Sequence, residues 1–276
     1  MKVLPFKIPK PSNTAIIFQI DSGQFYGQLH QHQELQISHI LKGNGTLLIA
    51  DTFHHFQEGD VFVIGGQQPH VFRSEVTDAL MHTVFFNPAS FGDSFLNLEE
   101  GKGVREFYAF AKAGFKTTAS QKLISTFQAL SQNEGLSRLA YFLLFIQLLT
   151  EGKYTPLSSF VYPKKITEAD GKKLHRIFEY SLQHYATAIQ LEDIADIAAM
   201  STNGFCKYFK KRTNKTYFQF LTEIRITQAC KLLKENPALS IATIAELSGF
   251  QTLSHFNRKF KYHKNISPSI YRSSFQ

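Results

Sequence analysis

The sequence has few of the features that mark secreted or membrane proteins. It contains only two cysteines, Cys206 and Cys230, and both fall in helical patterns, so we expect no disulfide framework. No segment approaches the ~18 consecutive apolar residues that a membrane-spanning helix needs. Residues 1–11 contain lysines and prolines but no apolar stretch of signal-peptide length. These absences predict a cytoplasmic protein that does not contact a membrane.

The positive charge is concentrated in one half of the chain. The 276 residues are 43% hydrophobic, which is enough for two compact domains, and the net charge is +8. Residues 1–163 hold 12 Lys+Arg and 13 Asp+Glu, whereas residues 164–276 hold 18 and 9, so the halves carry −1 and +9. This asymmetry indicates two domains with different functions, of which the basic one binds a polyanion. A basic surface that is simply solvated would have the same composition.

The N-terminal half has the pattern of short strands separated by turns. Between residues 16 and 86, strand-like runs are interrupted at Gly43–Gly45, at Glu58–Asp60 and at Gly65–Gly66, and no helical period occurs. Strands at this spacing predict a small barrel or sandwich.

Histidine is concentrated in the same half, which holds seven of the eleven. His30, His32, Glu34 and Gln36 alternate, so on a strand all four would point to one face. His70 follows Pro69 at the start of a later strand. The segment resembles a cupin barrel of the kind fused to bacterial regulators, and the residues that carry the resemblance are His30-Gln31-His32, Lys42–Thr46, Glu58–Val61 and Pro69-His70.

This resemblance implies a candidate site. Metal-binding cupins hold one metal with a His-x-His pair, a carboxylate and a distant histidine, and His30, His32 and His70 match the three histidines. Gln36 occupies the usual carboxylate position, and a neutral amide is a weaker ligand. We therefore expect no cofactor, and a polar pocket for a small organic effector is favoured over a metal site and over groups that only hydrogen-bond at the barrel mouth. The expected pocket residues are His30, His32, Glu34, Gln36 and His70.

Helical spacing begins near residue 99. Residues 104–113 and 121–132 have helical patterns, and residues 136–149 are apolar over most of a helix's circumference. Such a helix is buried on several sides, either within its own subunit or against a second subunit in a homodimer. Glu151–Lys165, with Pro156 and Pro163, has the composition of a linker.

The basic half contains an internal repeat with a period of about fifty residues. Ile194-Ala195 matches Ile244-Ala245, and Phe205 and Phe209 match Phe256 and Phe260. Each copy is predicted to form a short helix, a tight turn and a second helix, with Ser201 and Thr252 as the caps of the second helices. The phenylalanines, one turn apart, are core residues.

The opposite faces of the two second helices carry corresponding polar side chains. These are Asn203, Cys206, Lys207 and Lys210 in the first copy and Ser254, Asn257, Arg258 and Lys261 in the second. Arg and Asn can form bidentate bonds to guanine and adenine in the major groove, and lysines towards the far end, with Lys211 and Arg212, suit phosphates. A helix predicted between the copies, over residues 218–234, would be about 25 Å long and could hold the two units near the ~34 Å between successive major-groove faces.

The C-terminal residues 172–273 resemble the DNA-binding domain of the AraC/XylS family. The resemblance is carried by His184-Tyr185, Leu191–Ala195, Met200-Ser201, Phe205, Phe209–Lys211, Arg225-Ile226, Ala229, Leu232-Leu233, Ile244-Ala245, Gly249-Phe250, Phe256, Phe260-Lys261, Ser267-Pro268 and Tyr271-Arg272. It implies a ligand-responsive regulator that recruits RNA polymerase. Gly204 and Asn214-Lys215 depart from the family's pattern, and Gly204 costs roughly 1 kcal/mol of helix propensity, so the first unit is expected to be the softer one.

We thus expect an α+β protein in which a cupin-like sensor barrel (1–98) and a helical connector (99–163) precede an all-α domain with two helix-turn-helix units (164–276). It is predicted to be a sequence-specific transcriptional regulator under the control of a small molecule, and not an enzyme. A metal-dependent cupin enzyme fused to a DNA-binding domain and a ligand-independent regulator are the alternatives. The residues expected to contact double-stranded DNA are Thr202, Asn203, Cys206, Lys207, Lys210, Lys211, Leu253, Ser254, His255, Asn257, Arg258 and Lys261.

Overall fold

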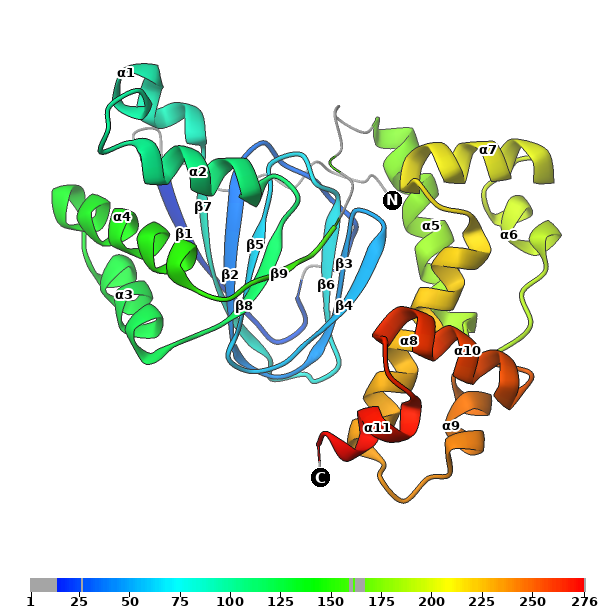
Figure 1. Ribbon diagram of the computed structural model, residues 1–276. Coiled ribbons are helices and arrows are strands. Elements are labelled where there is room, and N and C mark those ends of the chain that lie inside the picture. The colour runs from blue at the N-terminus through cyan, green and yellow to red at the C-terminus, as the bar shows by residue number, and fades with distance from the viewer. Residues whose placement is uncertain (1–13, 26, 159–160, 162–166, 276) are drawn as a thin grey trace. The chain divides into compact units, whose positions relative to one another are not determined.

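A computed structural model describes residues 14–25, 27–158, 161 and 167–275 (Figure 1). The chain divides into two compact units, residues 1–50 with 56–166 and residues 51–55 with 167–276. Within the described part, no helix combines the length and the hydropathy needed to cross a bilayer. Cys206 and Cys230 are both free thiols.

The strands before residue 157 form two sheets, in agreement with the barrel or sandwich predicted from short strands separated by turns. One sheet has the order β1-β7-β2-β5-β8-β9 and the other has the order β4-β3-β6. The strands are β1 (Ile16–Ser22), β2 (Leu35–Lys42), β3 (Gly45–Ile49), β4 (Thr52–Phe56), β5 (Asp60–Ile64), β6 (His70–Ser74), β7 (Leu80–Phe86), β8 (Phe115–Thr118) and β9 (Thr155–Pro156). The pairing of β9 with β8, in which Phe115 is opposite Pro156, corrects the expectation that this segment is only a linker. The remainder of that predicted linker includes residues 159–160 and 162–165, which lie outside the described part.

Strand β2 is buried on both faces, and its alternation assigns the two faces different tasks. Leu35 and Ile37 belong to a core shared with the helices that follow the strands. Gln36 and Ser38 point to the other face, where Gln36 meets His70 of β6 and Ser38 meets Thr83 of β7. The apolar face holds the helices on the sheet, and the polar face supplies the side chains of the barrel interior.

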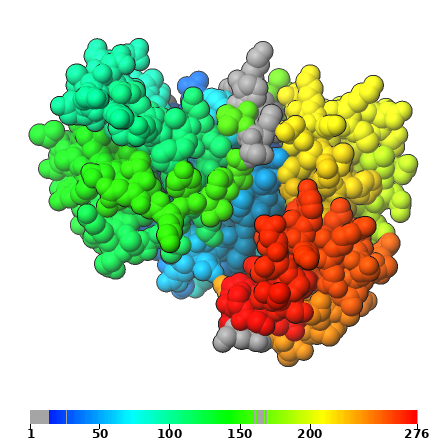
Figure 2. Space-filling view, in the orientation of Figure 1, coloured from blue at the N-terminus to red at the C-terminus, as the bar shows by residue number. Residues whose placement is uncertain are grey.

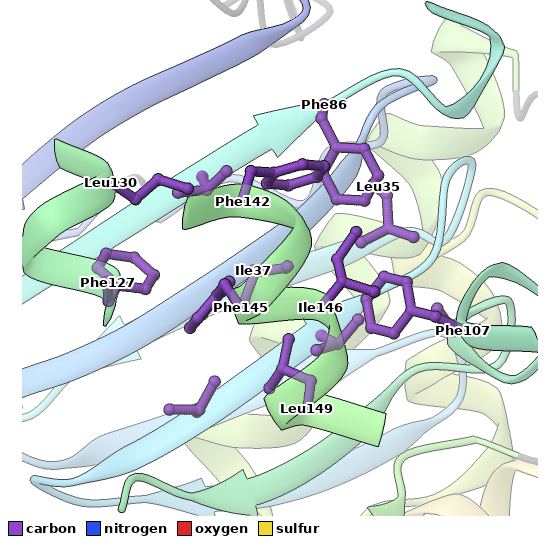
Figure 3. Close-up of a cluster of buried hydrophobic side chains, with 14 of the residues drawn as sticks. Leu35, Ile37, Phe86, Phe107, Phe127, Leu130, Phe142, Phe145, Ile146 and Leu149 are labelled. Carbon is purple, nitrogen blue, oxygen red and sulfur yellow. The ribbon is translucent and has the colours of Figure 1, made fainter. Parts of the chain in front are cut away.

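The helices of the first unit cover the apolar face. They are α1 (Gly92–Leu96), α2 (Lys102–Ala111), α3 (Gln121–Gln132) and α4 (Gly135–Glu151), preceded by a short 3-10 helix over Pro88–Phe91. Figure 3 shows α4 lying over the sheet, with Phe142, Phe145 and Ile146 among the side chains of the cluster that includes Ile37 and Phe86. Packing within one subunit therefore accounts for the buried part of this apolar helix.

The second unit is all-α. Its helices are α5 (Glu168–His184), α6 (Leu191–Ile197), α7 (Thr202–Thr213), α8 (Tyr217–Glu235), α9 (Ile241–Leu247), α10 (Leu253–Lys264) and α11 (Pro268–Ser273). The predicted helix over residues 218–234 is α8, one residue longer at each end. Helices α6 and α7 form the first helix-turn-helix, and α9 and α10 form the second. Helix α8 contacts α7 of the first helix-turn-helix and α9 and α10 of the second.

Each helix-turn-helix has its own core, and the predicted phenylalanines occupy both. Phe205 and Phe209 have no exposed surface, and their rings lie against Tyr217 of α8. Phe256 and Phe260 are equally buried and pack with Ile226, Ala229 and Leu233 from the second half of α8. The repeat in the sequence is therefore a repeat of buried contacts around one shared helix.

Candidate functional sites: a histidine cluster and two recognition helices

Backbone hydrogen bonds bring His30 and His70 together. The amide of each residue donates to the carbonyl of the other, at 3.1 and 2.8 Å, and the Gln67 amide donates to the His32 carbonyl at 2.7 Å. A side chain at position 66 would overlap the Gln33 carbonyl, so only glycine allows the two segments to approach this closely. The cluster is thus assembled by main-chain contacts between residues far apart in the sequence.

The three imidazoles are oriented in the same way. Each Nδ1 lies at hydrogen-bond distance from a main-chain carbonyl two residues away: His30 from Gln28 at 2.8 Å, His32 from Glu34 at 2.9 Å and His70 from Gln68 at 2.9 Å. The Nε2 atoms of His32 and His70 then lie 3.0 and 2.9 Å from Oε1 of Gln36. Four of the five residues predicted for this site, His30, His32, Gln36 and His70, therefore come together.

Burial keeps the rings of His30 and His70 neutral. It lowers the pKa of His30 to about 3 and lowers that of His70 well below its usual range, with the neighbouring histidines adding to the effect on His70. A neutral imidazole has one donor and one acceptor nitrogen, and each acts as a hydrogen-bonding group or as a metal ligand.

The expectation that one strand carries all four N-terminal residues is wrong. Strand β2 begins at Leu35, and His30 lies in an isolated bridge to His70. The side chain of Glu34 is buried, and its carboxylate lies 3.9 Å from Nδ1 of His32, the nitrogen opposite the Nε2 that meets Gln36. The hydrogen-bonded side chains instead continue along β2 from Gln36 to Ser38, whose Oγ lies 2.9 Å from Oγ1 of Thr83. Sequence reasoning missed Ser38, although it shares the face of Gln36 by simple alternation.

The two recognition helices begin with the predicted caps. Ser201 Oγ accepts a hydrogen bond from the Gly204 amide at 3.3 Å, and Thr252 Oγ1 accepts one from the His255 amide at 3.2 Å. Both helices end at an asparagine in the left-handed conformation, Asn214 and Asn265. The two copies are therefore alike at their ends as well as in their cores.

Most of the predicted DNA-contacting side chains are open to solvent. Ten are exposed and two, Thr202 and His255, are half-buried; the exposed ones are Asn203, Cys206, Lys207, Lys210, Lys211, Leu253, Ser254, Asn257, Arg258 and Lys261. Figure 2 shows the residues of α10 and α11, in orange to red, at the surface of this unit. Burial, with the charges of Arg258 and Lys259, lowers the pKa of His255, so this side chain is a neutral hydrogen-bonding group.

Two arginines have structural roles. Arg212, grouped above with phosphate-binding residues, forms an ion pair with Asp170 of α5. Arg225 on α8 donates to the carbonyls of Tyr185 and Thr187, at 2.8 and 2.9 Å, and so ties α8 to the turn after α5. Long-range partners of this kind have no signature in the local sequence.

The fold and the two sites define a class of protein, a two-domain DNA-binding regulator with a β-rich ligand-binding domain. The family model for the AraC-like ligand binding domain matches residues 13–149, and a helix-turn-helix domain model matches residues 194–274. The chain belongs to the AraC family of transcriptional regulators.

Relatives extend over nearly the whole chain. The uncharacterized HTH-type transcriptional regulator YdeC of Bacillus subtilis is 26% identical over 259 residues, which are 90% of this chain and 86% of that protein. The HTH-type transcriptional activator RhaR of Cronobacter sakazakii is 24% identical over 262 residues, 89% of this chain and 87% of the relative. Among solved structures, fatty-acid-bound ToxT of Vibrio cholerae is 16% identical with a TM-score of 0.39, over 96% of this chain and 97% of that one.

Proposed function

We propose that this regulator reads its operator with the exposed faces of α7 and α10. The observation that supports the proposal is the correspondence between the two helices, which share the cap, the buried phenylalanine pair and the exposed polar stripe. One such stripe alone would be explained as an ordinary solvated surface. Two matching stripes in a domain with a net charge of +9 between residues 164 and 276 fit a pair of helices that enter successive major grooves.

The side chains divide into two groups by their position along each helix. Thr202, Asn203, Cys206 and Lys207 on α7, and Leu253, Ser254, His255, Asn257 and Arg258 on α10, lie towards the helix starts and face the bases. Lys210, Lys211 and Lys261 lie towards the ends and bind phosphates, which adds affinity without sequence preference. We assign the stronger base discrimination to α10, because Arg258 and Asn257 are the side chains with bidentate geometry for guanine and adenine.

The barrel is the sensor in this proposal. A small ligand binds at His30, His32, Gln36 and His70, with Glu34 behind His32, and shifts the DNA-binding activity. The protein acts in the cytoplasm, on double-stranded DNA, and recruits RNA polymerase without catalysing a reaction itself. A homodimer is supported by α4, on which Leu136 is 81% exposed and Tyr141 is 37% exposed although the opposite side of the helix is buried.

Selection from a random duplex library tests the interface and identifies the operator motif in the same experiment. The full-length chain should enrich one motif, and Arg258→Ala should lose about 1–3 kcal/mol on that motif and relax the preference at one position. Lys210→Ala should weaken binding to all sequences alike and reduce the salt dependence. Lys122→Ala is the control, because it removes one exposed charge from α3 in the other domain; it should change neither the selected motif nor the salt dependence of binding. An unchanged motif with Arg258→Ala would refute the assignment of α10.

A further inference from the structure

A groove crosses the all-α unit between its two helix-turn-helices. Its walls come from the segment after α5, from the first half of α8 and from the turn before α10, and its volume is about 430 Å³. One water molecule needs only about 10–15 Å³, so the groove can take a group as large as a sugar ring or the edge of a base. Helix α8 contacts α7, α9 and α10, so all the walls belong to one compact unit (Figure 1).

The floor of the groove is apolar, and one aromatic side chain is exposed in it. Ile189, Leu221 and Phe250 line the groove and are buried, whereas Gln251 is exposed at its rim. Phe218 lines the same groove, yet 48% of its surface is open to solvent. A single exposed phenylalanine is common on protein surfaces, so its role depends on what the groove faces.

One cation belongs to the wall of the groove. Arg225 donates from Nε and from a terminal guanidinium nitrogen to the carbonyls of Tyr185 and Thr187. Carbonyl oxygens carry no net charge, so these contacts orient the guanidinium without neutralising it. Glu246 lines the groove as well but is exposed, so solvent screens its charge. The wall that contains Arg225 therefore favours an anionic partner.

The groove opens beside the proposed reading face of α10. His255 lines it, and His255 is one of the α10 residues assigned to the bases. When α7 and α10 lie in successive major grooves, a minor groove lies midway between them on the same side of the duplex, because the two kinds of groove alternate along one face of DNA. The groove between the helix-turn-helices therefore faces that minor groove.

We propose that this groove receives the minor groove between the two half-sites, with the Phe218 ring packed against its sugars and base edges. Proteins that bind the minor groove commonly combine apolar side chains with cationic ones, and Phe218 and Arg225 provide this combination. The exposed amide of Gln251 is a donor for a flanking phosphate. The inference rests on the proposed function of α7 and α10 and adds a third contact, through which the protein reads the centre of its operator.

Base analogues at the centre of the selected motif test this contact. We expect A·T pairs there, because the amino group of guanine projects into the minor groove and hinders the approach of an aromatic ring. Replacing them by G·C should weaken binding of the full-length chain about five- to tenfold. Inosine·cytosine pairs lack this amino group but present the major groove of G·C, so they should restore the affinity to within about twofold of the parent duplex.

Phe218→Ala is the matching protein variant. It removes apolar surface and no charge, so it should bind the parent motif about five- to tenfold more weakly with an unchanged salt dependence. It should also bind G·C and inosine·cytosine centres equally and keep the preferences at both half-sites. Phe275→Ala is the control, because Phe275 is likewise 48% exposed but lies outside the groove, and it should change none of these. Thermal melts without DNA check that both variants are folded.

Two results would overturn the inference. If Phe218→Ala bound the motif as the parent does, the groove would serve a ligand other than DNA. If inosine·cytosine centres bound as weakly as G·C centres, the protein would read these pairs in the major groove. Neither result affects the proposed role of α10, which Arg258→Ala tests at a half-site. If the library yielded no enriched motif, the proposed function would fail, and this inference would fail with it.

Discussion

Gly249 lets the second helix-turn-helix pack closely against the segment after α5, and Gly249→Ala should weaken the DNA-binding domain severely. Gly249 lies in the turn between α9 and α10 with a φ of +83°, in the left-handed region. A methyl group there would overlap the Tyr185 carbonyl oxygen, which is also the acceptor for Arg225 Nε. The substitution therefore strains the turn and displaces the contact that ties α8 to the segment after α5.

The magnitude follows from these two effects. A non-glycine residue in the left-handed region costs about 1–2 kcal/mol. Loss of a hydrogen bond from a charged donor costs about 1.5–3 kcal/mol, so we expect a total of about 2.5–5 kcal/mol. A domain with ~5–15 kcal/mol of stability would remain folded in buffer but unfold at a much lower urea concentration.

Urea titration of the full-length chain, followed by far-UV circular dichroism, measures this change. Gly59→Ala is the control, because Gly59 has a φ of +84° but no neighbouring atom within 4 Å of the added methyl group. It should cost only the backbone term of about 1–2 kcal/mol. If Gly249→Ala cost no more than the control, the close approach to Tyr185 would have no energetic weight and the reasoning would fail.

Three further predictions follow from single residues. Ser201→Ala removes the cap of α7 and should cost about 1 kcal/mol of stability, measured by urea titration, with weaker DNA binding. Gly204→Ala should raise the free energy of unfolding by less than the roughly 1 kcal/mol expected from helix propensity, because the new methyl group would lie 3.1 Å from Ser201 Oγ. A full gain of about 1 kcal/mol in the same titration would show that the Ser201 side chain moves away at no cost. Burial and His82 lower the pKa of His39 below its usual 6.5, so on acidification the unfolded chain takes up the His39 proton at a higher pH than the folded chain does. The contribution of His39 to the free energy of unfolding is therefore fully present above pH 6.5 and is lost as the pH falls from 6.5 towards the lower pKa of the folded chain. His39→Gln should flatten this dependence in thermal melts between pH 7 and pH 5, and an unchanged slope would exclude His39 as its source.

Local sequence patterns were sufficient to predict both architectures. Short strand-like runs separated by turn residues predicted the strands of the first half, because Gly-rich and Asp-rich turns are local in sequence. The spacing of Phe205 and Phe209, repeated at Phe256 and Phe260, predicted the two recognition helices, and Ser201 and Thr252 predicted where they begin. Both signals are local in sequence, because they join residues within one helical turn. The exposed stripe followed from the same geometry.

The amino-acid sequence by itself thus determined which side chains can be buried, where helices begin and which faces are basic. Only the tertiary structure decided which groups meet. It placed His70 against His30 by a main-chain bridge, turned the Glu34 carboxylate to the far side of His32, and paired Arg212 with Asp170. The physical reason is that the first and the last of these contacts join residues 40 and 42 positions apart, so no local period encodes them, and their geometry is set by how the sheets and helices pack.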